Sequence, residues 1–108
     1  MATRSEEIGR KIFSYEEAAA LLPAVERITA VAVEKVDELG ESEDNVERYQ
    51  LIVGDWAEAI IRLGIEVKGL WLIDFDCGSG YYCWQWPEPG LQFFHGYEEG
   101  FRGRMQLT

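Results

Sequence analysis

The chain has 108 residues, of which 47% are hydrophobic, and its 20 acidic residues against 10 basic ones give a formal net charge of −10 at pH 7. This length and composition fit one folded domain with a single core, which we expect over residues 1–108. The acidic balance argues against a nucleic-acid partner, because such a protein must neutralise phosphates with clustered Lys and Arg.

The N-terminal segment, residues 1–12, is expected to be a flexible arm that precedes the helices. Its sequence, MATRSEEIGRKI, contains no apolar segment of the kind that a secretory signal carries. No stretch of the chain approaches the roughly 18 apolar residues of a membrane-spanning helix, and two cysteines do not make a disulfide framework. We therefore expect a cytoplasmic protein with no membrane partner.

An antiparallel helical hairpin is predicted over residues 14–64. Ser14 followed by Glu17 is the pattern of a capping box, which satisfies free N–H groups where a helix begins. Because Pro23 removes an intrahelical bond, we expect a kink there, or a short helix followed by a longer one that starts near Pro23. Gly40 is expected to end this helix. Its apolar stripe recurs at steps of three and four residues: Ala18, Leu21, Val25, Ile28, Ala32, Val36 and Leu39.

A short polar linker leads to the second helix, for which Ser42 is the expected N-cap. Gly54 inside this helix is expected to let the first helix approach closely. So short a linker requires the two helices to be antiparallel. The apolar stripe of the second helix is Val46, Tyr49, Val53, Trp56, Ile60 and Leu63. Two helices and a thin sheet leave apolar surface uncovered, which predicts a homodimer or another protein partner.

From Ile65 onward, β-branched and aromatic residues interrupted by Gly and Pro are typical of strands. We expect a three-stranded antiparallel meander over residues 65–98, with turns at G-S-G and at P-E-P-G. The third strand is expected to place Leu91, Phe93 and His95 on one side. A meander this small needs a partner, so it is predicted to pack on the helical hairpin, with residues 99–108 as a tail. The predicted fold class is α+β.

Several motifs resemble one bacterial family, catalogued as domain of unknown function 2203. They are F-S-Y-E-E-A-A-A-L-L-P, G-I-E-V-K with I-D-F, and C-W-Q-W-P-E-P-G-L-Q-F-F-H followed by G-F-R-G-R. The resemblance extends over nearly the whole chain from Phe13 onward. Its motif residues fall on Glu66, Lys68, Asp74, Phe75, Trp84, Glu88, Pro89, His95, Gly100, Phe101, Gly103 and Arg104. The family pattern has an acid directly after the histidine and a Trp before it, where this chain has Gly96 and Phe94. Because members are not characterised biochemically, the resemblance implies a family without a reaction.

His95 is the first candidate for a functional site, because imidazole binds metals and transfers protons near neutral pH. The structural alternative is a hydrogen-bonded histidine at a strand end, which the absence of a metal-spaced partner in the sequence favours. Three acids, Glu66, Asp74 and Glu88, lie on or beside predicted strands, where burial is expensive unless each acid is paired. Lys68 and Arg104 are the expected partners, in either an ion-pair network or a polar site.

Cys77 and Cys83 flank the G-S-G turn, where they are expected to face each other. With His95 they would make a thiolate–imidazole zinc site. Five residues between cysteines is not a typical zinc spacing, so two free buried thiols and no metal are predicted instead. Trp84 is able to stack on a planar ligand, although aromatic residues at strand spacing mostly form core. The sequence assigns no cofactor.

Two functions remain open at this stage. The first is a small binding domain that forms a homodimer, or a complex with another protein, through its helical hairpin. The alternative is a small-molecule or metal-dependent enzyme in which His95 is a ligand or general base and Arg104 holds an anion. The candidate ligand-binding residues are His95, Glu88, Asp74, Arg104, Glu66, Lys68 and Trp84.

Overall fold

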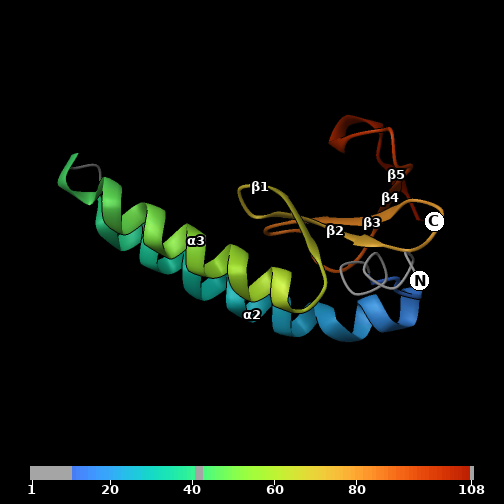
Figure 1. Ribbon diagram of the computed structural model, residues 1–108, viewed down its shortest axis with the longest axis horizontal. Helices are drawn as coiled ribbons and strands as arrows, with labels where there is room; N and C mark the ends of the chain where they lie inside the picture. The colour runs from blue at the N-terminus through green and yellow to red at the C-terminus, as the bar shows by residue number, and fades with distance from the viewer. Residues whose placement is uncertain (1–10, 41–42, 108) are drawn as a thin grey trace, which may run out of the picture.

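The computed structural model describes residues 11–40 and 43–107, and it confirms the α+β class. Two helices, α2 (Tyr15–Leu39) and α3 (Val46–Arg62), precede an antiparallel sheet. Figure 1 shows the sheet lying over one end of the helical hairpin, while the connection between the helices lies at the far end. Most of the expected N-terminal arm, and the predicted N-cap Ser42, fall outside the described residues. No helix in the described part of the chain is long and apolar enough to cross a membrane.

Helix α2 begins at the predicted capping box. The Oγ atom of Ser14 accepts from the backbone N–H of Glu17 at 3.0 Å, and the Glu17 carboxylate accepts from the Ser14 N–H at 2.9 Å. Pro23 lies inside one helix that runs from Tyr15 to Leu39, so the expected division into two helices is wrong. Buried Leu22 and Val25 on either side of Pro23 anchor both parts of the helix in the core, which offsets the single lost hydrogen bond.

Helix α3 follows a short 3₁₀ turn, η1 (Glu43–Asn45), with Asn45 in the N-cap position. The side-chain amide of Asn45 donates to the carbonyl oxygen of Leu39 and so closes the connection between the helices. Farther along, the indole N–H of Trp56 donates to the buried hydroxyl of Thr29 at 2.9 Å. A Cβ atom at Gly54 would meet nothing within 4 Å, so the expectation that Gly54 permits close helix packing is wrong.

The described sheet has five strands rather than three, in the order in which they occur along the chain. They are β1 (Glu66–Gly69), β2 (Leu72–Asp76), β3 (Tyr81–Gln85), β4 (Phe93–His95) and β5 (Met105–Gln106). Strand β1 is the first of the two strands that the sequence did not predict. It is separate from β2 because the chain reverses at Leu70 and Trp71, where Trp71 takes a φ of 58°. Strand β5 is the second, and it forms because the predicted tail returns beside β4.

The two faces of the sheet differ in chemistry. Ile73 pairs with Trp84, and both are fully buried in the core with Phe75, on the face that packs against the helices. Asp74 pairs with Cys83, so these side chains project from the opposite face. His95 and Phe93 also lie on that outer face, whereas Leu91 belongs to the core. The prediction that the three share one side is therefore wrong, because β4 begins only at Phe93.

Candidate functional site

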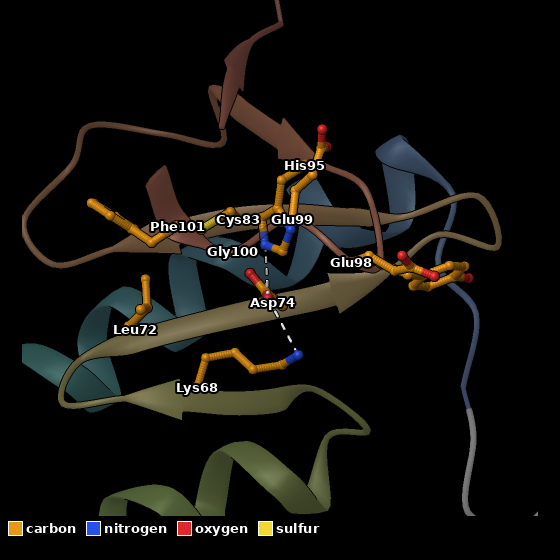
Figure 2. Close-up of a pocket in the computed structure, with 10 residues that line it drawn as sticks. Lys68, Leu72, Asp74, Cys83, His95, Glu98, Glu99, Gly100 and Phe101 are labelled. Carbon is orange, nitrogen blue, oxygen red and sulfur yellow. Dashed lines mark hydrogen bonds and ion pairs between the residues drawn. The ribbon is translucent and has the colours of Figure 1, made fainter. Parts of the chain in front are cut away.

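A pocket of about 370 Å³ lies on the outer face of the sheet. The segment 96–103, which includes the 3₁₀ turn η2 (Phe101–Gly103), borders it opposite the strands. Asp74, Cys83 and His95 belong to the polar part of its lining, and Leu72 and Phe101 form an apolar part. Figure 2 shows Leu72 and Phe101 at one side of this pocket and Glu98 at the other. The meander therefore brings residues from four strands, β1 to β4, to one cavity.

The centre of the pocket is a buried contact between His95 and Asp74. These residues are 3% and 2% exposed, and Nε2 of His95 lies 2.9 Å from Oδ2 of Asp74. The other ring nitrogen, Nδ1, lies 2.8 Å from the carbonyl oxygen of Gly96. A carbonyl oxygen only accepts, so Nδ1 carries a proton, and Nε2 then faces a second acceptor. A further proton or a cation must therefore lie between Nε2 and the carboxylate.

The carboxylate of Asp74 uses its two oxygens unequally. Oδ2 contacts His95 and also lies 3.7 Å from the ammonium nitrogen of Lys68, and Figure 2 shows both contacts as dashed lines. Oδ1 is buried and has no hydrogen-bond partner among the described residues. An unsatisfied buried acceptor costs about 1–3 kcal/mol. This oxygen is therefore able to take one more donor or a cation.

Cys83 brings a thiol to the same point. Its side chain is 1% exposed, and its Sγ atom lies within 4.8 Å of ligand atoms on both Asp74 and His95. Burial raises the pKa of the Cys83 thiol to about 12; the neighbouring carboxylate of Asp74 raises it too, while the Arg104 guanidinium opposes the rise. Imidazole nitrogen, thiolate sulfur and carboxylate oxygen are the three donor types that proteins offer to zinc.

Lys68 lies beside this group, on β1. Its ammonium is 3.3 Å from Glu66 and 4.1 Å from the centre of the Tyr81 ring. Burial alone would lower the pKa of Lys68, but the carboxylates of Glu66 and Asp74 outweigh it and raise the pKa above its ordinary value. Lys68 therefore stays charged at neutral pH and partly balances the acids around the pocket.

Arg104 forms a second polar group next to the pocket. Its guanidinium lies 2.8 Å from the carboxylate of Glu88 and is stacked between the rings of Phe93 and Phe101, at 3.9 and 4.0 Å. Glu88 also accepts from the backbone N–H of Gln85 at 2.9 Å. The Arg104 group thus joins the C-terminal segment to the end of β3, and it supports Phe101 where that residue lines the pocket.

The structure divides the predicted site residues into three sets. It brings His95, Asp74, Lys68 and Glu66 together, and it pairs Glu88 with Arg104 beside them. Trp84 lies on the other face of the sheet in the core, where its indole N–H donates to the carbonyl oxygen of Glu88 at 2.9 Å.

The prediction that the two cysteines face each other is wrong. Cys83 stands opposite Asp74, and Cys77 lies in the turn with its sulfur 3.8 Å from the hydroxyl of Ser79. The sequence suggested Cys83 as a partner of His95 only in a zinc site that also used Cys77, and it did not place Cys83 beside Asp74. Counting back symmetrically from the three residues of the G-S-G turn pairs Cys83 with Phe75, one residue away from the observed partner Asp74, so the turn alone does not reveal this pairing.

No curated protein and no solved structure matches the chain. One family model does match, described as "Uncharacterized conserved protein (DUF2203)", and it covers residues 11–107. This range contains both helices, all the described strands and the whole pocket lining, and it confirms the resemblance seen in the sequence motifs. The chain belongs to the DUF2203 family.

Proposed function

We propose that this chain is a binding domain for a small ligand, which it holds between the outer face of the sheet and residues 96–103. One observation carries the proposal. Oδ1 of Asp74 is buried without a hydrogen-bond partner among the described residues, and Asp74 lines the pocket. A protein that keeps a carboxylate oxygen unsatisfied at a cavity has a place for a group that completes it.

The charges around the pocket select the ligand's chemistry. Asp74, Glu98 and Glu99 line the pocket together with Lys68 and His95. A carboxylate oxygen only accepts, so the ligand has to present an N–H or O–H donor or a positive charge to Asp74. Leu72 and Phe101 offer apolar contact to the rest of the ligand. The volume of about 370 Å³ lies at the small end of the range for ligand sites, about 300–1,000 Å³.

The same geometry supports a catalytic role for His95, as the alternative from the sequence proposes. The carbonyl oxygen of Gly96 holds Nδ1 and so orients the ring, and in this role Nε2 transfers the proton at its contact with Asp74. Arg104 has another role in this proposal. Its guanidinium is already engaged by Glu88 and two phenylalanine rings, so we assign it to the support of the pocket wall rather than to a bound anion.

Native mass spectrometry on untagged protein, purified without a chelator, tests the binding function. The wild type is compared with Asp74→Asn, and Asp76→Asn is the matched control. Asp76 is a buried acid on the same strand and the same face, and it bonds to Gly78 and Tyr97 rather than lining the pocket. We expect a stoichiometric extra mass on the wild type and on Asp76→Asn, and none on Asp74→Asn. Bare wild-type chains that no amine, polyol or divalent metal stabilises against heat would refute the proposal.

A second candidate function is self-association through the far end of the helical hairpin. Figure 1 shows that this end extends beyond the sheet. Val31 on α2, and Val46 and Leu51 on α3, are exposed there, and Leu51 is 66% exposed. Lys35, Glu38 and Arg48 lie around the same surface. A second copy of the chain, related by a two-fold axis, would cover the apolar side chains and pair these mixed charges with each other.

Sedimentation velocity at micromolar concentration tests this second function. Leu51→Glu is expected to convert a dimer into a monomer, whereas Ile61→Glu is not. Ile61 is a matched control, because it is also an exposed apolar residue of α3 but lies near the opposite end of the helix. A wild type that sediments as a monomer throughout the concentration series would refute self-association.

A further inference from the structure

Three residues of the pocket carry side-chain atoms of the kinds that hold metal ions in proteins. Asp74, Cys83 and His95 come from β2, β3 and β4, and each is buried. One oxygen, one sulfur and one nitrogen from these side chains lie within 4.8 Å of one another. We propose that Asp74, Cys83 and His95 bind one zinc ion, with the fourth coordination position open to the pocket. This inference rests on the proposed function, since it names the ligand of the same pocket.

The distances suit a single ion. Zinc bonds of about 2.0–2.3 Å in a tetrahedral arrangement place the ligand atoms about 3.3–3.6 Å apart. Here Nε2 of His95 is 2.9 Å from Oδ2 of Asp74, and no pair of the three donor atoms exceeds 4.8 Å. Side-chain movements of about 1 Å therefore suffice for the ion to replace the contact between His95 and Asp74.

The hydrogen bonds of His95 also fit a metal ligand. A ligating histidine almost always donates its second ring N–H to a carbonyl or carboxylate, which fixes the ring and leaves the other nitrogen free for the metal. Nδ1 of His95 has such a partner in the carbonyl oxygen of Gly96, 2.8 Å away. Nε2 consequently points its lone pair toward Asp74, where a cation resolves the conflict between two acceptors. The unpartnered Oδ1 of Asp74 leaves the carboxylate with spare bonding capacity for the same cation.

The donor types select zinc among common ions. Magnesium and calcium prefer oxygen ligands, and a thiolate disfavours both. Carboxylate, thiolate and imidazole together suit Zn²⁺, and three protein ligands with one open position are typical of catalytic rather than structural zinc. On binding, the Cys83 thiol forms the Zn–S bond and releases its proton to solvent. Nη1 of Arg104, 4.0 Å from Sγ, stabilises the thiolate that forms.

Metal titration of chelator-treated, untagged wild type tests the inference with two probes. Zn²⁺ affinity is measured by calorimetry against a competing chelator. Co²⁺ is used because a cobalt–thiolate bond gives a charge-transfer band in the near ultraviolet. The variants are Cys83→Ser and the matched control Cys77→Ser, since Cys77 lies in the turn away from the cluster. Circular dichroism checks that each variant is folded.

We expect wild type and Cys77→Ser to bind one ion and to show the cobalt–thiolate band. Cys83→Ser should lose the band, and its Zn²⁺ affinity should fall by about 100-fold or more, because loss of a supporting group alone costs about 10–100-fold. The test stands even if Cys83→Ser does not fold. A cobalt–thiolate band that is present in wild type and persists in Cys77→Ser identifies Cys83 as the ligand, because the chain has two cysteines. A wild type that binds neither ion stoichiometrically, or a folded Cys83→Ser that keeps the band, would overturn the inference.

The failure of this inference is distinguishable from the failure of the proposed function. If wild type binds no metal but retains an organic molecule that Asp74→Asn releases, the zinc site is wrong and the ligand-binding function stands. If neither a metal nor an organic molecule binds, both are wrong.

Discussion

Nε2 of His95 lies 2.9 Å from Oδ2 of Asp74, although the strands that carry them are not neighbours in the sheet. Strand β3 runs between β2 and β4, and adjacent strands are about 4.8 Å apart. The imidazole therefore reaches across a whole strand to the carboxylate. On β3, Cys83 pairs with Asp74 and Tyr81 pairs with His95, so the contact crosses the sheet diagonally beside Cys83. The order of the meander thus places three different chemical groups at one point.

Removal of His95 should destabilise the metal-free protein more than removal of both partners. In His95→Ala the carboxylate of Asp74 stays buried with the Lys68 ammonium 3.7 Å away as its remaining ion-pair partner among the described residues, and breaking a buried pair in this way costs about 3–5 kcal/mol. Adding Asp74→Asn removes the charge that has lost its partner. We therefore expect the double variant to be more stable than His95→Ala alone, as measured by urea unfolding. If the double variant loses as much unfolding free energy as the two single variants together, the two side chains are not coupled.

The two cysteines should differ sharply in reactivity. Cys83 is buried with a pKa of about 12, while Cys77 is partly exposed in the turn. At pH 8 a pKa of about 12 leaves about one thiol in 10,000 as the reactive thiolate. The metal-free native protein should therefore take up one equivalent of iodoacetamide, on Cys77, and a second only after unfolding. Cys77→Ser is the control and should take up none while folded; equal reaction of both thiols in the native wild type would contradict the expectation.

Arg104 should hold the C-terminal segment on the sheet through its shape as well as its charge. Its planar guanidinium stacks between Phe93 and Phe101 while it bonds to Glu88, and a lysine cannot do both. We expect Arg104→Lys to cost about 1–2 kcal/mol and to speed amide exchange in β5. Arg102→Lys, an exposed neighbour, is the control. Similar exchange rates in the two variants would show that charge alone is sufficient.

The helices and the hairpin turn were predictable because their signals are local. The capping box at Ser14 and the stop at Gly40 appear in the structure where the sequence places them. The turn between β1 and β2 was not predictable, because a tryptophan at a φ of 58° carries no turn signature. Strand β5 has only two residues, and its pairing with β4 depends on where the chain returns rather than on its own pattern.

The candidate site was predictable as a set of residue types but not as an arrangement. The sequence placed His95 and Asp74 in one set of candidate ligand-binding residues, but it could not give the register across three strands that places them in contact. The same register was needed to identify Cys83, rather than Cys77, as the cysteine beside Asp74 and His95. Trp84 was named as a site candidate because its ring is able to stack on a planar ligand. It follows Cys83 directly, and adjacent residues of a strand point to opposite faces, so Trp84 is in the core.

The hydrogen bond between Trp56 and Thr29 should be a specific stabilising link between the helices. Thr29→Val keeps the shape of the side chain but leaves the buried indole N–H without its acceptor, which costs about 1–3 kcal/mol. Thr29→Ser keeps the hydroxyl and loses one methyl group, which costs about 1 kcal/mol. Chemical denaturation should therefore rank Thr29→Val below Thr29→Ser in stability. The reverse order would show that packing of the methyl group matters more than the bond.

Two glycine-to-alanine substitutions should change stability in opposite directions. A Cβ atom at Gly80 would lie 2.6 Å from the carbonyl oxygen of His95 and 2.6 Å from the ring of Phe94, so the G-S-G turn and β4 would have to separate. We expect a loss of about 1–3 kcal/mol, the usual cost of overpacking. A Cβ atom at Gly54 meets nothing within 4 Å, and alanine in a helix is favoured over glycine by about 1 kcal/mol. Thermal unfolding should therefore show a lower Tm for Gly80→Ala and a higher one for Gly54→Ala. A Gly80→Ala variant as stable as wild type would show that the sheet does not depend on the close approach of Gly80 to His95 and Phe94.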